Sequence, residues 1–281
     1  MRVRFLGVRG STPAPGAEFV RVGGNTSCVA VAREREAPTF VLDAGTGLRR
    51  LARELGGAPF RGTILLTHLH WDHVQGLPFF DAGDRDDARV ELVLPGQGSG
   101  EDGSAEAALA RGMSPPHFPI GPDGLRGTWR FRSIEPGEHS FEGFSVLAAE
   151  VPHKGGRTFG YRVSDGNGSF AYVPDHEPTV EGPGPDGFGA RHEAVLELSK
   201  GVDVLVHGAQ YTLDERARAV AFGHATVDYA LALARDAEVG RLVLFHHEPG
   251  RTDDEVEAMA STSTSEGLPV QAAVEGLEVE V

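Results

Sequence analysis

Short apolar runs separated by polar or glycine-rich segments extend along the whole chain. The runs are four to eight residues long and together rich in Val, Leu, Ile and Phe, a length and composition typical of buried β-strands. They predict strands at residues 3–6, 28–32, 39–42, 63–67, 90–94, 129–134, 144–151, 158–163, 169–173, 203–206 and 241–247.

Segments with helical spacing lie between some of these strands, and they predict helices at residues 48–55, 105–111, 191–200, 225–236 and 253–265. Because the strands follow one another closely and several end at glycine-rich loops, we expect an α/β fold with one sheet and its loops gathered at one edge. No composition break marks a domain boundary, so residues 1–281 are interpreted as a single domain. The irregular segment 96–127 is interpreted as an insertion that caps the active site or packs on a second subunit.

Composition narrows the classes of partner. The chain has 281 residues, 40% of them hydrophobic, a formal net charge of −15 and only two lysines, Lys154 and Lys200. This balance argues against extended nucleic acid as a partner, but not against a small anionic substrate held by metal ions. The single cysteine, Cys28, excludes an intrachain disulfide and a Cys-based zinc site. Since we see no apolar leader and no membrane-spanning run, we expect a cytoplasmic protein with no membrane contact.

A dense cluster of polar side chains follows the predicted strand at 63–67. The pattern H-x-H-x-D-H is formed by His68, His70, Asp72 and His73. Imidazole and carboxylate together suit zinc, iron or manganese, and a turn from a buried strand into a helical segment brings these side chains to one point. The alternative is a histidine-rich surface loop. That alternative does not explain why the cluster follows directly after a buried strand. The pattern therefore predicts a metal site.

Three later apolar runs also lead to a residue that can bind a metal, namely His153, Asp175 and His246. Each alone is more commonly a capping or core residue, but four strand ends that deliver ligand-type side chains are hard to attribute to chance. Two metal centres can be assembled from the whole set, with Asp175 as a bridge between them: His68, His70 and His153 in one, and Asp72, His73 and His246 in the other.

Further polar residues lie near these strand ends. Asp43 follows the strand at 39–42 and is interpreted either as a carboxylate that orients a metal-bound His or as a turn residue. His207 is a candidate for a supporting role of the same kind. His247 is another such candidate. Adjacent residues of a strand point to opposite faces, so His247 cannot point to the metal together with His246.

The remaining charged and imidazole side chains have more ordinary interpretations. His117 in the insertion either contacts substrate or belongs to a packed surface loop. His139 and His192 are expected at the surface. Lys154 and Arg157 are interpreted as solvated charges, with contact to phosphate as the alternative.

In order along the chain, the seven candidate ligands match the motifs of the metallo-β-lactamase-fold hydrolases, and the chain resembles that family from Phe5 to about Glu248. The resemblance implies a four-layered αβ/βα sandwich with two divalent metal ions at the sheet edges, zinc being expected and manganese the alternative. The segment His224-Ala225-Thr226 before a helix resembles the phosphodiesterase branch, which includes ribonuclease Z.

Three further segments, at 7–15, 23–26 and 113–119, resemble a subgroup of small phosphodiesterases that act on cyclic nucleotides or cyclic phosphates. This similarity makes Asn25 a candidate for contact with substrate or with the ligands. It also implies a homodimer.

The chemistry that the resemblance implies fits these residues. Two metals about 3.5–4 Å apart hold a shared hydroxide and clamp the phosphate for in-line displacement, and metal binding lowers the pKa of water to about 7. The leaving alkoxide needs a proton, for which His224 is the candidate acid, with a capping or core His as the alternative. Asp72 is interpreted both as a ligand and as the acceptor of a proton from the attacking water.

Two departures from ribonuclease Z bear on this interpretation. The family has Glu after the histidine that matches His207, whereas this chain has Gly208. Either another carboxylate, Glu177 or Glu248, supports His224, or proton donation is weaker. The basic arm with which ribonuclease Z grips transfer RNA is also missing.

The leading interpretation is a dinuclear metal phosphodiesterase that acts on a small anionic phosphodiester, foremost a cyclic nucleotide. One alternative is a ribonuclease Z-like endonuclease that processes RNA 3′ ends. Another is a non-catalytic, metal-loaded protein that binds a nucleotide. Hydrolysis of a lactam or a thioester is disfavoured by the segment at 224–226.

Overall fold

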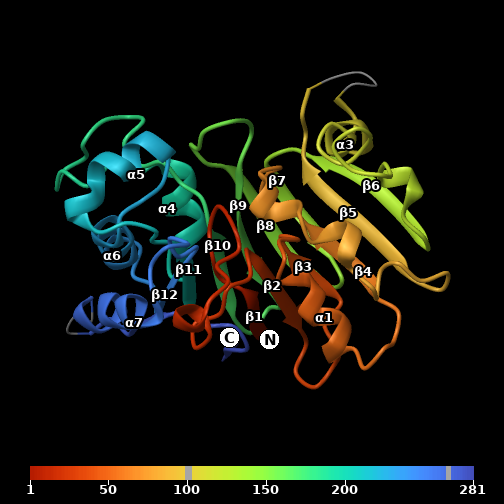
Figure 1. Ribbon diagram of the computed structural model, residues 1–281. Helices are drawn as coiled ribbons and strands as arrows, with labels where there is room; N and C mark the ends of the chain where they lie inside the picture. Colours follow the sequence, from red (N-terminus) through yellow and green to blue (C-terminus); the bar gives the residue numbers. More distant parts are fainter. Residues whose placement is uncertain (99–102, 264–266) are drawn as a thin grey trace.

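A computed structural model of the protein describes residues 1–98, 103–263 and 267–281. Two mixed seven-stranded sheets lie face to face in this part of the chain, with helices on both outer sides (Figure 1). The helices α1 and α3 flank one sheet, and α4, α6 and α7 flank the other. The fold is therefore the predicted αβ/βα sandwich.

The first sheet has the strand order β14-β1-β2-β3-β4-β5-β6. Strands β3 to β6 pair in parallel, so their carboxyl ends meet at one edge, while the other pairs are antiparallel. The bounds are β1 (Arg2–Gly7), β2 (Cys28–Ala32), β3 (Phe40–Leu42), β4 (Arg61–Leu65), β5 (Arg89–Pro95), β6 (Thr128–Ile134) and β14 (Glu278–Glu280).

The second sheet has the order β13-β12-β11-β10-β9-β8-β7. Its parallel part is β10 to β13, and β7 to β10 are antiparallel. The bounds are β7 (Gly137–Phe141), β8 (Phe144–Glu150), β9 (Phe159–Ser164), β10 (Ser169–Val173), β11 (Val204–Gly208), β12 (Leu242–Phe245) and β13 (Val270–Ala272).

The helices are short, and none of those in the described residues is long and apolar enough to cross a membrane. The α-helices are α1 (Leu48–Glu54), α2 (Trp71–Val74), α3 (Ala105–Ala110), α4 (Glu193–Ser199), α5 (Arg216–Phe222), α6 (Val227–Asp236) and α7 (Asp253–Thr262). The 3₁₀ turns are η1 (Ala17–Phe19), η2 (Leu77–Phe79), η4 (Pro122–Gly124) and η5 (Leu213–Glu215).

Alternate side chains of one strand enter different cores, which explains why the strands are apolar throughout. In β4, Leu65 faces the core between the sheets, and Ile64 faces the core under α1 and α3. In β12, Phe245 enters the central core, and Leu244 packs under α6 and α7. Such strands are buried on both faces, as expected when helices cover the outside of each sheet.

The expectation of a single sheet was wrong, because an apolar run shows that both faces of a strand are buried but not which strands are neighbours. Among the elements that the sequence did not predict are the polar edge strand β7 and helix α5, of which only Ala219 is buried. The tight turn at Glu142 and Gly143, both with positive φ, joins β7 to β8. The end of the predicted helix 253–265 and residues 99–102 of the insertion lie outside the described residues.

A fully buried arginine ties the start of the chain to the loop after β12. Arg9 donates from Nε to the carbonyl of Gly23 at 2.8 Å and from one terminal nitrogen to the carbonyl of Arg251 at 2.6 Å. Its other terminal nitrogen lies 3.4 Å from Asp253, at the start of α7. Backbone hydrogen bonds join the same segments, from Gly10 N–H to His247 O and from His247 N–H to Val8 O, each at 2.9 Å.

Replacing Arg9 by Lys is expected to lower the free energy of unfolding by about 2–4 kcal/mol, because one ammonium cannot reach acceptors that surround a planar guanidinium, and a buried acceptor without a partner is costly. Chemical denaturation measures the loss. Arg21→Lys is the matched control: its ion pairs to Asp254 and Glu257 are exposed, so its loss should be much smaller. Equal losses in the two variants would contradict the anchoring role of Arg9.

Candidate metal centre

The ends of four strands and helix α2 bring the predicted ligands to the same edge of the sandwich. The corner after β4 supplies His68 and His70, and α2 supplies Asp72 and His73. The segments after β8, β10 and β12 supply the other three, His153, Asp175 and His246.

Six of the seven side chains form two compact groups, with the same members as the two centres proposed from the sequence. In each group the ligand atoms lie within 4.8 Å of one another: His68, His70 and His153 in the first, and Asp72, His73 and His246 in the second. Asp175 forms a third group of this kind with His68 and His73, and thereby lies between the other two.

The carboxylate of Asp175 has the surroundings of a cation ligand. It is 1% exposed. Its Oδ2 lies 2.7 Å from His73 Nε2, 3.4 Å from His246 Nε2 and 3.7 Å from His68 Nε2, and its Oδ1 lies 2.9 Å from His224 Nδ1. Imidazole nitrogens and carboxylate oxygens therefore converge on one small volume. A buried carboxylate without compensating positive charge is strongly unfavourable, and a cation among these atoms would supply that charge.

The ionisation of the histidines agrees with this interpretation. Burial lowers the pKa of His68 and His70, and lowers the pKa of His153 to about 4. These imidazoles are consequently neutral at neutral pH, which is the form that binds a metal. Burial alone would also lower the pKa of His73, but the neighbouring carboxylates, with Asp72 first among them, raise it well above its usual range. The site thus favours added positive charge.

Asp43 orients His73 by contacting the ring nitrogen that faces away from the candidate metal site. It is fully buried, and its carboxylate accepts hydrogen bonds from Thr67 N–H at 2.8 Å and from the Tyr172 hydroxyl at 2.9 Å. Its Oδ2 lies 2.8 Å from His73 Nδ1, so Nε2 of that ring points to the site. This is the contact expected of a carboxylate that orients a metal-bound His.

A residue that the sequence analysis did not assign to the site, Ser11, contacts Asp72 directly. Its backbone N–H donates to Asp72 Oδ2 at 2.7 Å, and its hydroxyl accepts from the side chain of Gln210 at 3.2 Å. The preceding Gly10 is needed because a Cβ there would lie 2.4 Å from the ring of His246. The segment 7–15 carried the signal, but it was used only as a mark of family resemblance.

The proposed acid His224 lies at the mouth of the site with its side chain 11% exposed. Its Nδ1 is 2.9 Å from Asp175 Oδ1, whereas neither Glu177 nor Glu248 contacts it within the described part of the chain. Glu248 instead pairs with Arg218 at 3.4 Å. The carboxylate beside His224 is therefore Asp175, not either residue named from the sequence.

The structure also explains why Glu is absent after His207. A Cβ at Gly208 would lie 2.0 Å from the carbonyl oxygen of Pro174. Because β11 and β10 approach so closely here, no side chain fits at position 208 without moving the segment that carries Asp175.

Other candidates from the sequence lie away from the ligands. The Asn25 amide binds Glu275 at 3.0 Å, and His247 is buried with its Nε2 2.9 Å from Ala273 O. His207 is buried, with its ring near those of His176 and Tyr229.

One surface assignment was wrong. His192 is only 4% exposed, and its Nδ1 lies 2.7 Å from His176 Nε2. The residue caps the start of α4 and packs inward, which its polar neighbours in the sequence did not reveal.

An open cavity of about 600 Å³ is lined by five of the candidate ligands, His70, Asp72, His153, Asp175 and His246, together with Ser11, Gln210, Tyr211, Arg218 and Phe222. Arg218 is the sole Arg or Lys among the described residues that line it. The two basic residues considered as phosphate contacts are engaged elsewhere: Lys154 donates to the carbonyls of Val220 and Ala221, and Arg157 pairs with Glu135 and Glu150.

Comparisons with known proteins agree with the geometry. Residues 39–247 match the model of the Beta-lactamase superfamily domain. Ribonuclease Z of Haloarcula marismortui is 26% identical over 289 residues, covering 88% of this chain and 86% of its own. Among solved structures, a diphosphatase of the PhnP family has a TM-score of 0.70 at 19% identity and covers 100% of this chain and 97% of its own. The short form of human tRNase Z has a TM-score of 0.65 at 20% identity, with 100% and 99% covered.

The matched model spans most of the sequence, so the chain belongs to the β-lactamase superfamily. Within the superfamily its sequence is similar to that of ribonuclease Z. The family predicted from the ligand motifs is thereby confirmed.

Proposed function

We propose that the protein hydrolyses a small phosphodiester, with cyclic nucleotides as the leading substrate class, and that it does so with two divalent cations. The observation that carries the proposal is the pair of ligand groups, with Asp175 between them and His224 beside them. The two cations would be held by His68, His70 and His153 on one side and by Asp72, His73 and His246 on the other, with Asp175 shared.

The donor set of imidazoles and carboxylates fits zinc, with manganese as the alternative. When bound, such cations neutralise the negative charge of a phosphodiester and lower the pKa of water. The side chains of the protein must then accept a proton from the attacking water and give one to the leaving group.

Asp72 is positioned to take up a proton. Its Oδ2 is held by the Ser11 N–H at 2.7 Å and lies 3.0 Å from His246 Nε2. Its Oδ1 has no hydrogen bond from the described residues. The carboxylate is thus fixed by one oxygen and faces the cavity as a proton acceptor with the other.

His224 is positioned to deliver a proton. With Nδ1 against Asp175, its ring directs Nε2 away from that carboxylate, and the residue lines the cavity. Asp175 fixes the orientation of the ring, which gives a proton to the leaving alkoxide. Helix α6 starts just after it, with Thr226 capping the helix, so His224 itself is free of the capping role.

The charge of the protein favours a small substrate over a long nucleic acid. The net charge of −15 and the single Arg218 in the cavity give little hold on a long polyanion. The ribonuclease Z relatives nevertheless make RNA 3′ ends the second candidate substrate. The expectations of a homodimer and of a cytoplasmic location rest on resemblance and composition, and they stay predictions.

Metal-loaded protein should turn over one or more members of a panel of cyclic mononucleotides, and also a generic aryl phosphodiester, but not precursor transfer RNA. Product analysis by chromatography measures each substrate separately. Cleavage of precursor transfer RNA with no turnover of cyclic nucleotides would favour the nuclease. Tight nucleotide binding with no turnover of any diester would favour a binding protein.

His224→Ala should lower kcat for a cyclic nucleotide by about 10²–10⁴-fold, because the ribose alkoxide needs a proton to leave. The loss should be much smaller for bis(4-nitrophenyl) phosphate, whose leaving group is stable without one. Metal content, measured by mass spectrometry, should stay that of the wild type. His139→Ala, which alters a histidine on β7 bound to the Glu135 carbonyl, is the control, and equal losses on both substrates would refute the acid role.

A further inference from the structure

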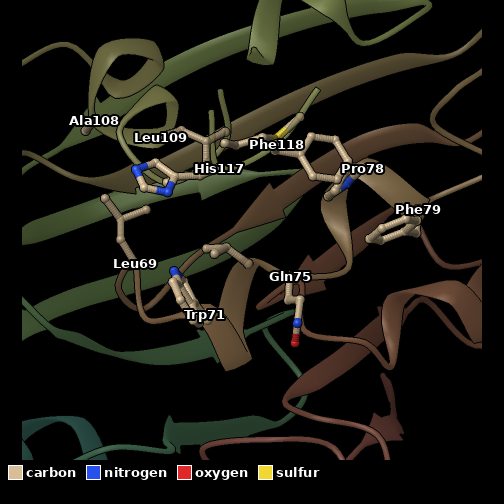
Figure 2. A pocket seen from close by; sticks show the side chains of 12 residues that line it. Leu69, Trp71, Gln75, Pro78, Phe79, Ala108, Leu109, His117 and Phe118 are labelled. Atoms are coloured by element: carbon tan, nitrogen blue, oxygen red, sulfur yellow. The ribbon is translucent and has the colours of Figure 1, made fainter. Parts of the chain in front are cut away.

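A second cavity, of about 390 Å³, lies beside the metal centre. Figure 2 shows Leu69, Trp71 and Gln75 along one side and His117 and Phe118 along the other. The first side belongs to the corner that carries the ligands and to α2, and the second belongs to the insertion 96–127. The volume is within the range of roughly 300–1,000 Å³ usual for small-molecule sites.

The cavity is apolar and uncharged. The described residues that line it include no Asp, Glu, Lys or Arg. Two of its aromatic side chains are unusually open to solvent, Trp71 at 73% and Phe79 at 53%. Exposed aromatic rings next to a reaction centre favour a flat, neutral ligand over an additional phosphate.

Two polar side chains in the cavity lack partners. The side chains of Gln75 and His117 make no hydrogen bond within the described part of the chain. An amide with a donor and an acceptor, together with an imidazole, can pair with the polar edge of a heterocycle whose faces lie against aromatic rings.

The wall formed by the insertion is anchored in the fold. Ala105 and Leu109 of α3 are buried in the core under the first sheet. The chain after α3 is held by Met113 N–H to Leu109 O at 3.1 Å and by the N–H groups of His117 and Phe118 to Ser114 O at 2.8 and 2.9 Å. His117 and Phe118 are therefore presented by a supported turn.

The two cavities adjoin, since Leu69 and Trp71 line both. Trp71 stands in the chain between His70 and Asp72, each a candidate ligand. A ligand with its phosphate at the metal centre therefore has a neighbouring apolar site for the group attached to that phosphate.

We propose that this cavity binds the heterocyclic base of a nucleotide, with Trp71 and Phe118 supplying aromatic surface and Gln75 and His117 reading the edge of the base. The proposal rests on the proposed function and deepens it: the substrate is a nucleotide and not merely a diester. It also gives the insertion a role, as the second wall of the base site.

Tryptophan fluorescence tests the proposal without catalysis. The chain has two tryptophans, so Trp129→Phe leaves Trp71 as the reporter. In metal-loaded Trp129→Phe protein, nucleoside 5′-monophosphates should quench the emission saturably, and ribose 5-phosphate at the same concentrations should not. Trp71→Phe, which retains Trp129, should show no such quenching.

Phe118→Ala in the same background should weaken nucleotide binding roughly 5- to 150-fold, the range for loss of one base–aromatic contact. Phe118→Leu keeps apolar volume, so its nucleotide affinity should lie between those of the Ala variant and the parent. It also controls for a folding defect in the Ala variant. Absent quenching, equal quenching by ribose 5-phosphate, or unchanged affinity in both Phe118 variants would overturn the base site.

The experiments can refute the base site and the proposed diester hydrolysis independently of each other. Base-dependent quenching in protein that hydrolyses no diester would retain the base site and refute the proposed function. Turnover of the aryl diester without base-dependent quenching would retain diester hydrolysis and refute the base site. A Trp71 emission that depends on protein concentration and not on nucleotide would show that a second copy of the chain covers the cavity, and would also refute it.

Discussion

The structure depends on one electrostatic constraint: the carboxylate of Asp175 is buried, and histidine ring nitrogens surround it at 2.7–3.7 Å. An isolated buried carboxylate would be strongly destabilising. The neighbouring Asp72 and Asp43 add negative charge and raise the pKa of His73, so the site favours positive charge. The arrangement is that expected of a cation site.

The two-sheet architecture makes this concentration of ligands possible. Carboxyl ends of parallel strands meet at the sheet edge in both halves of the sandwich, so β4 delivers its corner opposite the ends of β10 and β12. Two of the ligands are held by neighbouring residues: Asp43 contacts His73, and Ser11 donates a hydrogen bond to Asp72. Arg9 holds the loop of His246 against the start of the chain.

The sequence was most informative where chemistry and local pattern coincide. The strand at 63–67 and the spacing of the histidines after it predicted the corner, because both are local properties of a few consecutive residues. The number of sheets was not predictable in this way, since pairing between distant strands leaves no local signature. The support of His224 by Asp175, the burial of His192 and the need for Gly208 likewise depend on which segments meet in space.

The central claim is that side chains from four strand ends hold two cations. Native mass spectrometry of the intact chain, titrated with zinc to saturation, tests it most directly. The account predicts two zinc ions bound per chain. Saturation at a single ion, or no specific binding, would contradict it.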